Sequence, residues 1–226
     1  MRYQDIIHLP ITATEVKQAI TRAQRVHFID NLRYRHPNVS FDSKVRGYVG
    51  EIGFRKWLKH HNVPIEAQNQ WSERAQMDVD FQCKGRSLEL KTSLIPNVDN
   101  NLKTSFQRRD IKLIKRKAKV SDLCSDIHVQ IYFNQNKKLK EQWLREQKID
   151  LTNADTDQLY NQLLGRAYLK HTYLVAWMDK QSLQDRLQQL PLAQQTWSHA
   201  KRQFWVCPLR HCFAPNTLID FLNARS

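Results

Sequence analysis

The sequence predicts an α/β fold built around a mixed β-sheet. Three observations support this prediction: two helical stretches lie near the N-terminus, a hairpin of alternating strands follows, and helices then alternate with strands. The chain has 226 residues, of which 41% are hydrophobic and 10% aromatic, so it is long and apolar enough to build a core. We expect a single domain over residues 1–226, with N-terminal helices within 12–61.

The first predicted helix starts at Thr12 or Thr14, with Glu15 completing a capping box. A loose 3.6-residue period of apolar side chains carries it to about Tyr34. The sequence His36-Pro37-Asn38 is expected to end it, because a residue before proline avoids helical geometry. A separate helix should therefore follow.

The second helix is predicted over residues 44–61, with Asp42 or Ser43 as its N-cap. Three of the five glycines in the chain lie within it, and they are Gly47, Gly50 and Gly53. A glycine inside a helix costs about 1 kcal/mol relative to alanine, so close packing of this helix on a sheet is expected to explain them. Glu51 shares a helix face with apolar side chains and is expected to point inward.

A hairpin follows, in which residues 77–83 and 86–91 are strands joined at Lys84-Gly85. With a two-residue turn, Phe81 faces Leu88 on one side of the hairpin, and this side is apolar. Asp80 faces Glu89 on the opposite side. The other face then carries the ionisable side chains Asp78, Asp80, Glu89 and Lys91. Opposed carboxylates destabilise a ladder unless a cation lies between them, and Mg²⁺ prefers such ligands. The alternative is a solvent-facing strand with loosely paired charges.

The remaining elements are predicted from periodicity and from breaks at proline and asparagine. Helices are expected at 106–120, 137–147, 180–190 and 215–223, and strands at 125–133, 172–178 and 203–207. Residues of about 137–170 are expected to form an insertion or a set of extra helices. The catalytic hairpin, taken as 77–92, would lie at the centre of this order.

The formal charge of +14 is concentrated in one segment. Residues 101–120 contain eight Lys and Arg side chains against Asp110 alone. A local surplus of this kind favours a polyanion such as DNA, because cations that neutralise phosphates release condensed counterions. The predicted nucleic-acid-binding residues are Arg108, Arg109, Lys112, Lys115, Arg116 and Lys119. A solvated basic helix face is the alternative interpretation.

The hairpin and the helix before it resemble the PD-(D/E)XK nuclease superfamily. Leu88-Glu89-Leu90-Lys91-Thr92-Ser93 is similar to the second half of the motif that names this superfamily. Gly47-Tyr48-Val49-Gly50-Glu51 resembles the Gly-X-X-Gly-Glu helix that many members place just before it. The resemblance covers residues 44–93 and is weaker at 172–183 and 204–215. No proline precedes either aspartate, so Asp78 is the alternative to Asp80.

The resemblance implies a restriction-endonuclease-like core, with a central mixed sheet flanked by helices in the order αβββαβ. It implies a metal-dependent nuclease that hydrolyses phosphodiester bonds in DNA, as an endonuclease of a restriction, defence or mobile-element type. Asp80 and Glu89, supported by Glu51, would bind Mg²⁺, with Mn²⁺ as a substitute. Lys91 would orient the attacking water or help to deprotonate it.

Two other functions stay open at this point. One is a catalytically inactive nucleic-acid-binding module on the same fold, and the other is a structure-specific resolvase or repair nuclease. A homodimer, or a partner protein from a larger system, is compatible with these functions.

Membrane insertion is not expected, because no apolar run approaches the roughly 20 residues that span a bilayer. The N-terminus lacks the apolar region of a signal peptide, and the four scattered cysteines favour a reducing, cytoplasmic compartment. Cys207, His211 and Cys212 lack an obvious fourth ligand, so we interpret them as a buried strand cysteine and a loop pair, and not as zinc ligands.

Overall fold

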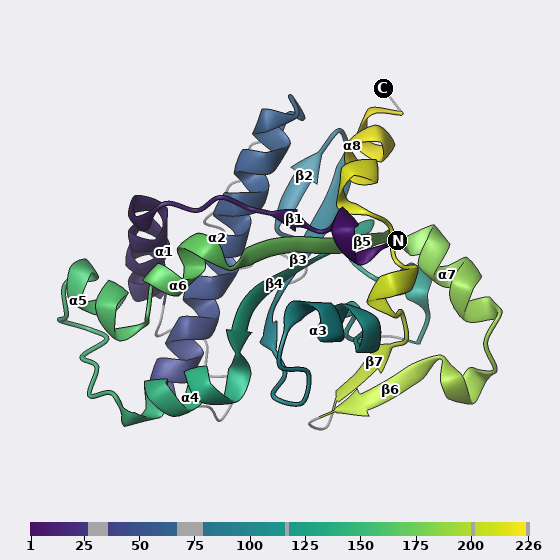
Figure 1. Cartoon of the computed structure of the whole chain (residues 1–226). Coiled ribbons are helices and arrows are strands. Elements are labelled where there is room, and N and C mark those ends of the chain that lie inside the picture. The colour runs from purple at the N-terminus through teal and green to yellow at the C-terminus, as the bar shows by residue number, and fades with distance from the viewer. Residues whose placement is uncertain (27–35, 67–78, 116–117, 200–201, 225–226) are drawn as a thin grey trace.

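The computed structural model of the chain describes residues 1–26, 36–66, 79–115, 118–199 and 202–224. Its central feature is a five-stranded mixed sheet of order β1-β5-β4-β3-β2, with helices on both sides (Figure 1). The strands are β1 (Ile7–His8), β2 (Phe81–Cys83), β3 (Arg86–Ile95), β4 (Ile127–Asn136) and β5 (Thr172–Asp179). Strands β3 and β4 are parallel, and the other neighbours are antiparallel. The expected α/β class with a mixed sheet is confirmed.

Helix α1 (Ala13–Val26) begins at the capping box that the sequence predicts. Between the two candidate caps the structure selects Thr12, whose Oγ1 accepts the N–H of Glu15 at 3.3 Å. The Glu15 carboxylate accepts the N–H of Thr12 in return, at 2.8 Å. The predicted continuation to Tyr34 lies outside the described residues.

Helix α2 (Pro37–His60) starts earlier than predicted, because Pro37 is its first residue and does not break it. Proline suits this position, since the N–H that it lacks would have no partner within the helix. Asp42 is not an N-cap. Its buried carboxylate instead accepts the hydroxyl of Tyr168 and lies 3.5 Å from Nζ of Lys140.

Two of the three α2 glycines are explained by close packing. A Cβ on Gly50 would lie 2.7 Å from Cγ2 of Thr92 in β3, and one on Gly53 would lie 2.9 Å from Cδ1 of Ile11. Gly47 has no such neighbour within 4 Å, so packing does not account for it. Helix α2 therefore packs closely on β3 at Gly50 and on the segment before α1 at Gly53, on either side of Glu51.

The hairpin between β2 and β3 has the predicted register. Phe81 pairs with Leu88 and Cys83 with Arg86. Lys84 and Gly85 form the turn with φ angles of 49° and 70°, the positive values that a tight two-residue hairpin turn requires. Strand β3 continues to Ile95, beyond the predicted end. Asp78, at the start of the predicted hairpin, lies outside the described residues.

The predicted helix over residues 106–120 is wrong. Helix α3 (Leu102–Arg108) ends before most of this segment, and residues 109–115 are extended. The N–H of Ile111 bonds to the carbonyl of Cys207, and the carbonyl of Leu113 accepts the N–H of Trp205, each at 2.9 Å. Ile111 and Leu113 are buried at alternate positions, so pairing and burial together favour the extended form.

The C-terminal half follows the predicted order with one addition. Its helices are α4 (Lys137–Glu146), α5 (Thr156–Gln162), α6 (Arg166–Lys170), α7 (Lys180–Gln188) and α8 (Pro215–Asn223). Strands β6 (Thr196–His199) and β7 (Arg202–Trp205) form a separate two-stranded sheet, of which the sequence predicted only β7. Short 3₁₀ turns lie at Tyr3–Asp5, Val120–Asp122, Leu192–Gln194 and Leu209–His211.

Two hydrophobic clusters cover the two faces of the sheet. One joins α1, α2 and α8 to alternate side chains of the central strands, including Leu88 and Val129. The other joins α3, the 109–115 segment, α7 and β7 to side chains such as Tyr132. Residues of opposite parity in β3 and β4 therefore face different layers. Among the described residues no helix is long and apolar enough to cross a membrane.

Candidate functional site

The parallel pair β3 and β4 brings four polar side chains onto one face. Glu89 pairs with His128 in the register of these strands, and Lys91 pairs with Gln130. Their parity is opposite to that of Leu88, so they face away from α2. Glu89 is only 5% exposed, which makes it a buried carboxylate and not a side chain on a solvent-facing strand.

Both carboxylate oxygens of Glu89 have partners. The ammonium group of Lys91 bonds to Oε1, and Nδ1 of His128 lies 3.0 Å from Oε2. Burial acts to raise the pKa of Glu89, but the hydrogen bond with His128 and the charge and hydrogen bond of Lys91 outweigh it, so the pKa lies below its ordinary value. Glu89 is therefore a fixed anion.

Gln130 holds the main chain of β3 at Lys91. Its Nε2 donates to the carbonyl of Lys91 at 2.8 Å and to Oγ of Ser93 at 3.0 Å. Its Oε1 accepts the N–H of Lys112 at 3.1 Å, which ties the extended 109–115 segment to the same place. The strand that carries Lys91 is thus fixed from the neighbouring strand and from the layer above.

Asp80 lies at the edge of the sheet, where the pairing of β2 ends. Its N–H donates to the carbonyl of Leu88 at 2.9 Å, and its Oδ2 accepts the N–H of Leu90 at 2.6 Å. The side chain thus satisfies a β3 donor that no residue of β2 reaches. The residue as a whole is exposed, whereas its carboxylate is held against the strand.

The carboxylate of Asp80 is crowded by other negative charges. Burial of this group and the charge of Glu51 raise its pKa to about 7, and the charge of Glu89 adds to the effect. The N–H of Leu90 and the charge of Lys91 act in the opposite direction. The predicted residues Glu51, Glu89 and Lys91 therefore each act electrostatically on Asp80.

Glu51 reaches this neighbourhood from α2. It is partly buried as predicted, but it is not unpaired, since it accepts Nη1 of Arg22 from α1 at 2.6 Å. The guanidinium of Arg22 also lies over the ring of Tyr48, 3.9 Å from its centroid. Burial raises the pKa of Glu51 even though Arg22 opposes this change.

The structure adds Arg22, His128 and Gln130 to the residues that the sequence singled out. Each meets its partner through tertiary contacts, so no local pattern marked any of them. The only sequence signal for His128 and Gln130 was their position on a predicted strand.

The described residues contain no group of three or more His, Cys, Asp and Glu side chains arranged to hold a metal ion. Glu51, Asp80 and Glu89 carry the carboxylate oxygens that Mg²⁺ prefers as ligands, but they are not among themselves a ready-made metal-binding group. In this conformation, an ion would share the oxygens of Glu89 with Lys91 and His128. Cys207 and Cys212 are buried free thiols whose Sγ atoms lie 3.5 Å apart.

The predicted nucleic-acid-binding residues do not share a helix face, since the helix ends at Arg108. Arg108 itself is exposed at the end of α3. Arg109 forms two hydrogen bonds of 2.7 Å with the buried Asp99, and Lys115 lies 4.8 Å from the ring centroid of Trp205. Of the others, Lys112 is half-buried, Lys119 is exposed and Arg116 lies outside the described residues.

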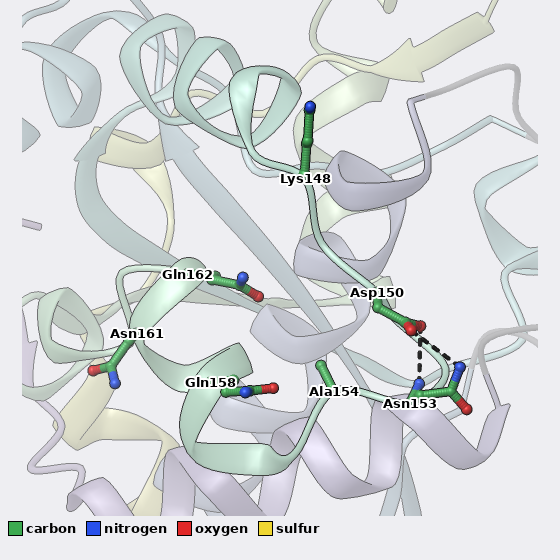
Figure 2. A pocket seen from close by; sticks show the side chains of 7 residues that line it. All are labelled: Lys148, Asp150, Asn153, Ala154, Gln158, Asn161 and Gln162. Carbon is green, nitrogen blue, oxygen red and sulfur yellow. Dashed lines mark hydrogen bonds between the residues drawn. The ribbon is translucent and has the colours of Figure 1, made fainter.

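A separate polar hollow of about 480 Å³ is formed by the loop after α4 and by α5 (Figure 2). It is lined by Lys148, Asp150, Asn153, Ala154, Gln158, Asn161 and Gln162. Asp150 is engaged by the main-chain N–H and Nδ2 of Asn153 at 2.9 and 3.0 Å. These elements carry none of the predicted site residues, so we place the candidate site at the carboxylates and not in this hollow.

Comparisons with known proteins add no relative. No protein-family model, curated protein or solved structure matches the chain. What the protein does must therefore be inferred from the chemistry of its own residues.

Proposed function

We propose that the protein is a metal-dependent nuclease that hydrolyses phosphodiester bonds in DNA. The observation that carries the proposal is the crowding of carboxylates beside a lysine. Burial and the negative charge of Glu51 raise the pKa of Asp80 to about 7, with a further contribution from Glu89. A divalent cation among these groups would relieve their repulsion, and a phosphate oxygen would complete its coordination.

Under this proposal Asp80 and Glu89, supported by Glu51, hold Mg²⁺, with Mn²⁺ as a substitute. When bound, the ion would polarise the scissile phosphate and offset its negative charge. Arg22 keeps Glu51 in place through the 2.6 Å hydrogen bond from α1. Asp80 is tied to the main chain of β3 by the N–H of Leu90, so its carboxylate stays at the sheet edge.

Lys91 supplies the positive charge of the proposed site. Its side chain is 22% exposed, so its ammonium can meet a substrate while it contacts Glu89. There it can donate to a phosphate oxygen or orient the attacking water for displacement. The hydrogen bond from Gln130 to the Lys91 carbonyl fixes the strand from which the side chain extends.

A restriction-endonuclease-like core is part of the same proposal. It is supported by the order of elements around the site: helix α2, the β2–β3 hairpin, a crossover that contains α3, and the parallel strand β4. The net charge of +14 supports a polyanionic substrate. We favour DNA among the polyanions on the strength of the sequence resemblance.

A second candidate is a nucleic-acid-binding module that does not cleave. It is favoured by the engagement of both Glu89 oxygens and by the lack, within the described residues, of a ready-made metal cluster. Both candidates need the basic surface, but only the nuclease needs the carboxylates and Lys91.

A cleavage assay separates the two candidates. Supercoiled plasmid and labelled DNA and RNA oligonucleotides are incubated with Mg²⁺, Mn²⁺ or EDTA and the wild type, Glu89→Gln, Lys91→Ala or the control Lys138→Ala. Lys138 is an exposed lysine of α4. We expect metal-dependent DNA cleavage by the wild type and the control, with a loss of at least about 100-fold in the two site variants.

Cleavage that survives Lys91→Ala would contradict the site. Salt-sensitive binding of DNA by a wild type that cuts no substrate would favour the binding module. Metal-dependent cutting confined to branched DNA would instead indicate a structure-specific resolvase or repair nuclease.

A further inference from the structure

A buried histidine lies against the carboxylate at the centre of the candidate site. His128 is 1% exposed and stands beside Glu89 in the parallel ladder of β3 and β4. Its Nδ1 lies 3.0 Å from Oε2 of Glu89. Its Nε2 is enclosed by the protein and has no hydrogen-bond partner among the described residues.

This arrangement is costly for a side chain that only fills the core. With Nδ1–H donating to the carboxylate, Nε2 is left buried and without a partner among the described residues, which is unfavourable for a polar atom. Packing alone therefore does not explain a histidine at this position.

The contact also determines which way Glu89 presents its second oxygen. Lys91 bonds to Oε1, on the opposite side of the carboxylate from His128. Among the hydrogen bonds of the described residues, His128 is the one side-chain partner of Oε2. Without it, Lys91 alone among the described side chains would hold the carboxylate, and rotation about its last bond meets only low barriers.

We propose that His128 is a positioning residue that donates to Oε2 of Glu89 and so directs Oε1 toward Lys91 and the place of the cation. The inference rests on the proposed function, because it concerns the same site. Carboxylates that bind metals depend on such outer hydrogen bonds, and loss of one weakens metal affinity or activity by about 10- to 100-fold.

The test compares three substitutions at one position. Asparagine places an amide N–H near the position of Nδ1, glutamine places one near that of Nε2, and leucine supplies neither. His171→Leu is the matched control, because His171 also has a buried ring nitrogen without a partner but lies between α6 and β5. Mn²⁺ binding is measured by calorimetry and by the rise in Tm on adding the ion, and cleavage is measured separately.

We expect His128→Leu and His128→Gln to weaken Mn²⁺ binding by about 10- to 100-fold. His128→Asn should lie much closer to the wild type, and His171→Leu should equal it. If the leucine variant does not fold, the contrast between asparagine and glutamine decides. Binding by asparagine that is no tighter than binding by glutamine would overturn the inference.

Failure of the inference can be told apart from failure of the proposed function. A wild type that binds Mn²⁺ and cuts DNA, beside a folded His128→Leu with unchanged affinity, removes only the role of His128. A wild type that binds no Mn²⁺ and cuts no substrate removes the proposed function and the role of His128 together.

Discussion

At the scale of single residues, the three carboxylates of the candidate site differ because their partners differ. Glu89 has hydrogen bonds to both oxygens, and its pKa lies below the ordinary value. Burial of the Asp80 carboxylate, with the negative charge of Glu51, raises its pKa to about 7. Glu51 lies between these cases, with one guanidinium partner and a pKa raised by burial. Asp80 is therefore the group that should titrate near neutral pH.

Titration of Asp80 predicts a pH-dependent effect of Asp80→Asn on stability in EDTA. The folded pKa of about 7 lies above the ordinary 3.8, so the folded state holds a proton that the unfolded state releases. The resulting stabilisation is fully present below the unfolded pKa and is lost as pH rises through about 7. The stability of Asp80→Asn relative to wild type should therefore increase from about pH 5 to about pH 8.

Thermal unfolding of both proteins across this range measures the effect. The expected sign is a Tm difference that moves in favour of Asp80→Asn as the pH rises. A difference that stays constant across the range would mean that Asp80 ionises at its ordinary pKa.

At the scale of elements, helix α2 joins the core to the site. Gly50 and Gly53 let it approach β3 and the segment before α1, and Glu51 stands between them. The hairpin contributes Asp80 from its end and Glu89 from its second strand. A change in the spacing between α2 and β3 should therefore disturb stability and the carboxylate group together.

The α2 glycines predict opposite effects of one substitution at two positions. Gly47→Ala should stabilise the protein by about 0.5–1 kcal/mol, because alanine favours a helix and no described atom opposes the new Cβ. Gly50→Ala should destabilise it by about 1–3 kcal/mol, because its Cβ would lie 2.7 Å from Cγ2 of Thr92. Denaturant unfolding measures both changes.

The double variant Gly50→Ala with Thr92→Ser is the internal control. Serine lacks Cγ2, so it should restore part of the stability that Gly50→Ala removes. Additive losses in the double variant would show that the contact with Thr92 is not the cause.

Two consecutive arginines at the end of α3 predict a second pair of contrasting variants. Arg109→Ala should lower stability by about 1–3 kcal/mol, because the buried Asp99 loses both hydrogen bonds from the guanidinium. Arg108→Ala should leave Tm unchanged and weaken DNA binding, since Arg108 is exposed. Thermal unfolding and fluorescence anisotropy with labelled DNA separate the two effects. Equal Tm values for both variants would contradict the structural role of Arg109.

At the scale of the whole molecule, the charge of +14 is not displayed on one helix. The basic segment divides between α3, an extended run beside β7 and the turn at Val120–Asp122. Some of its cations have internal partners, such as Asp99 for Arg109 and the ring of Trp205 for Lys115. Fewer cations than the sequence suggests are therefore free to meet phosphates.

This division predicts a moderate dependence of DNA affinity on salt. About three phosphate contacts would give a slope of about −2.7 in a plot of log affinity against log salt. That slope corresponds to a loss of roughly 40-fold between about 50 and about 200 mM salt. Anisotropy titrations with duplex and single-stranded DNA measure it, and a slope near zero would remove the electrostatic case for a nucleic-acid partner.

Much of the fold could be predicted because its signals are local. The turn at Lys84-Gly85 and the alternation around it were enough to set the register of Phe81 with Leu88. The capping box at Thr12 and Glu15 located the start of α1 in the same way. The helix predicted around Ile111 is wrong because the apolar spacing of this segment suits either a helix or a strand. Main-chain hydrogen bonds with Trp205 and Cys207 stabilise the extended form.

The sequence by itself determined the α/β class, the hairpin and the set of ionisable residues to examine. Only the tertiary structure decided what those residues meet. Arg22 reaches Glu51 from another helix, and His128 reaches Glu89 from a strand that lies far along the chain. Periodicity and turn chemistry act over a few residues and are readable from the chain. Charge pairing and pKa depend on distance in space, which is set only when α1, α2, β3 and β4 pack together.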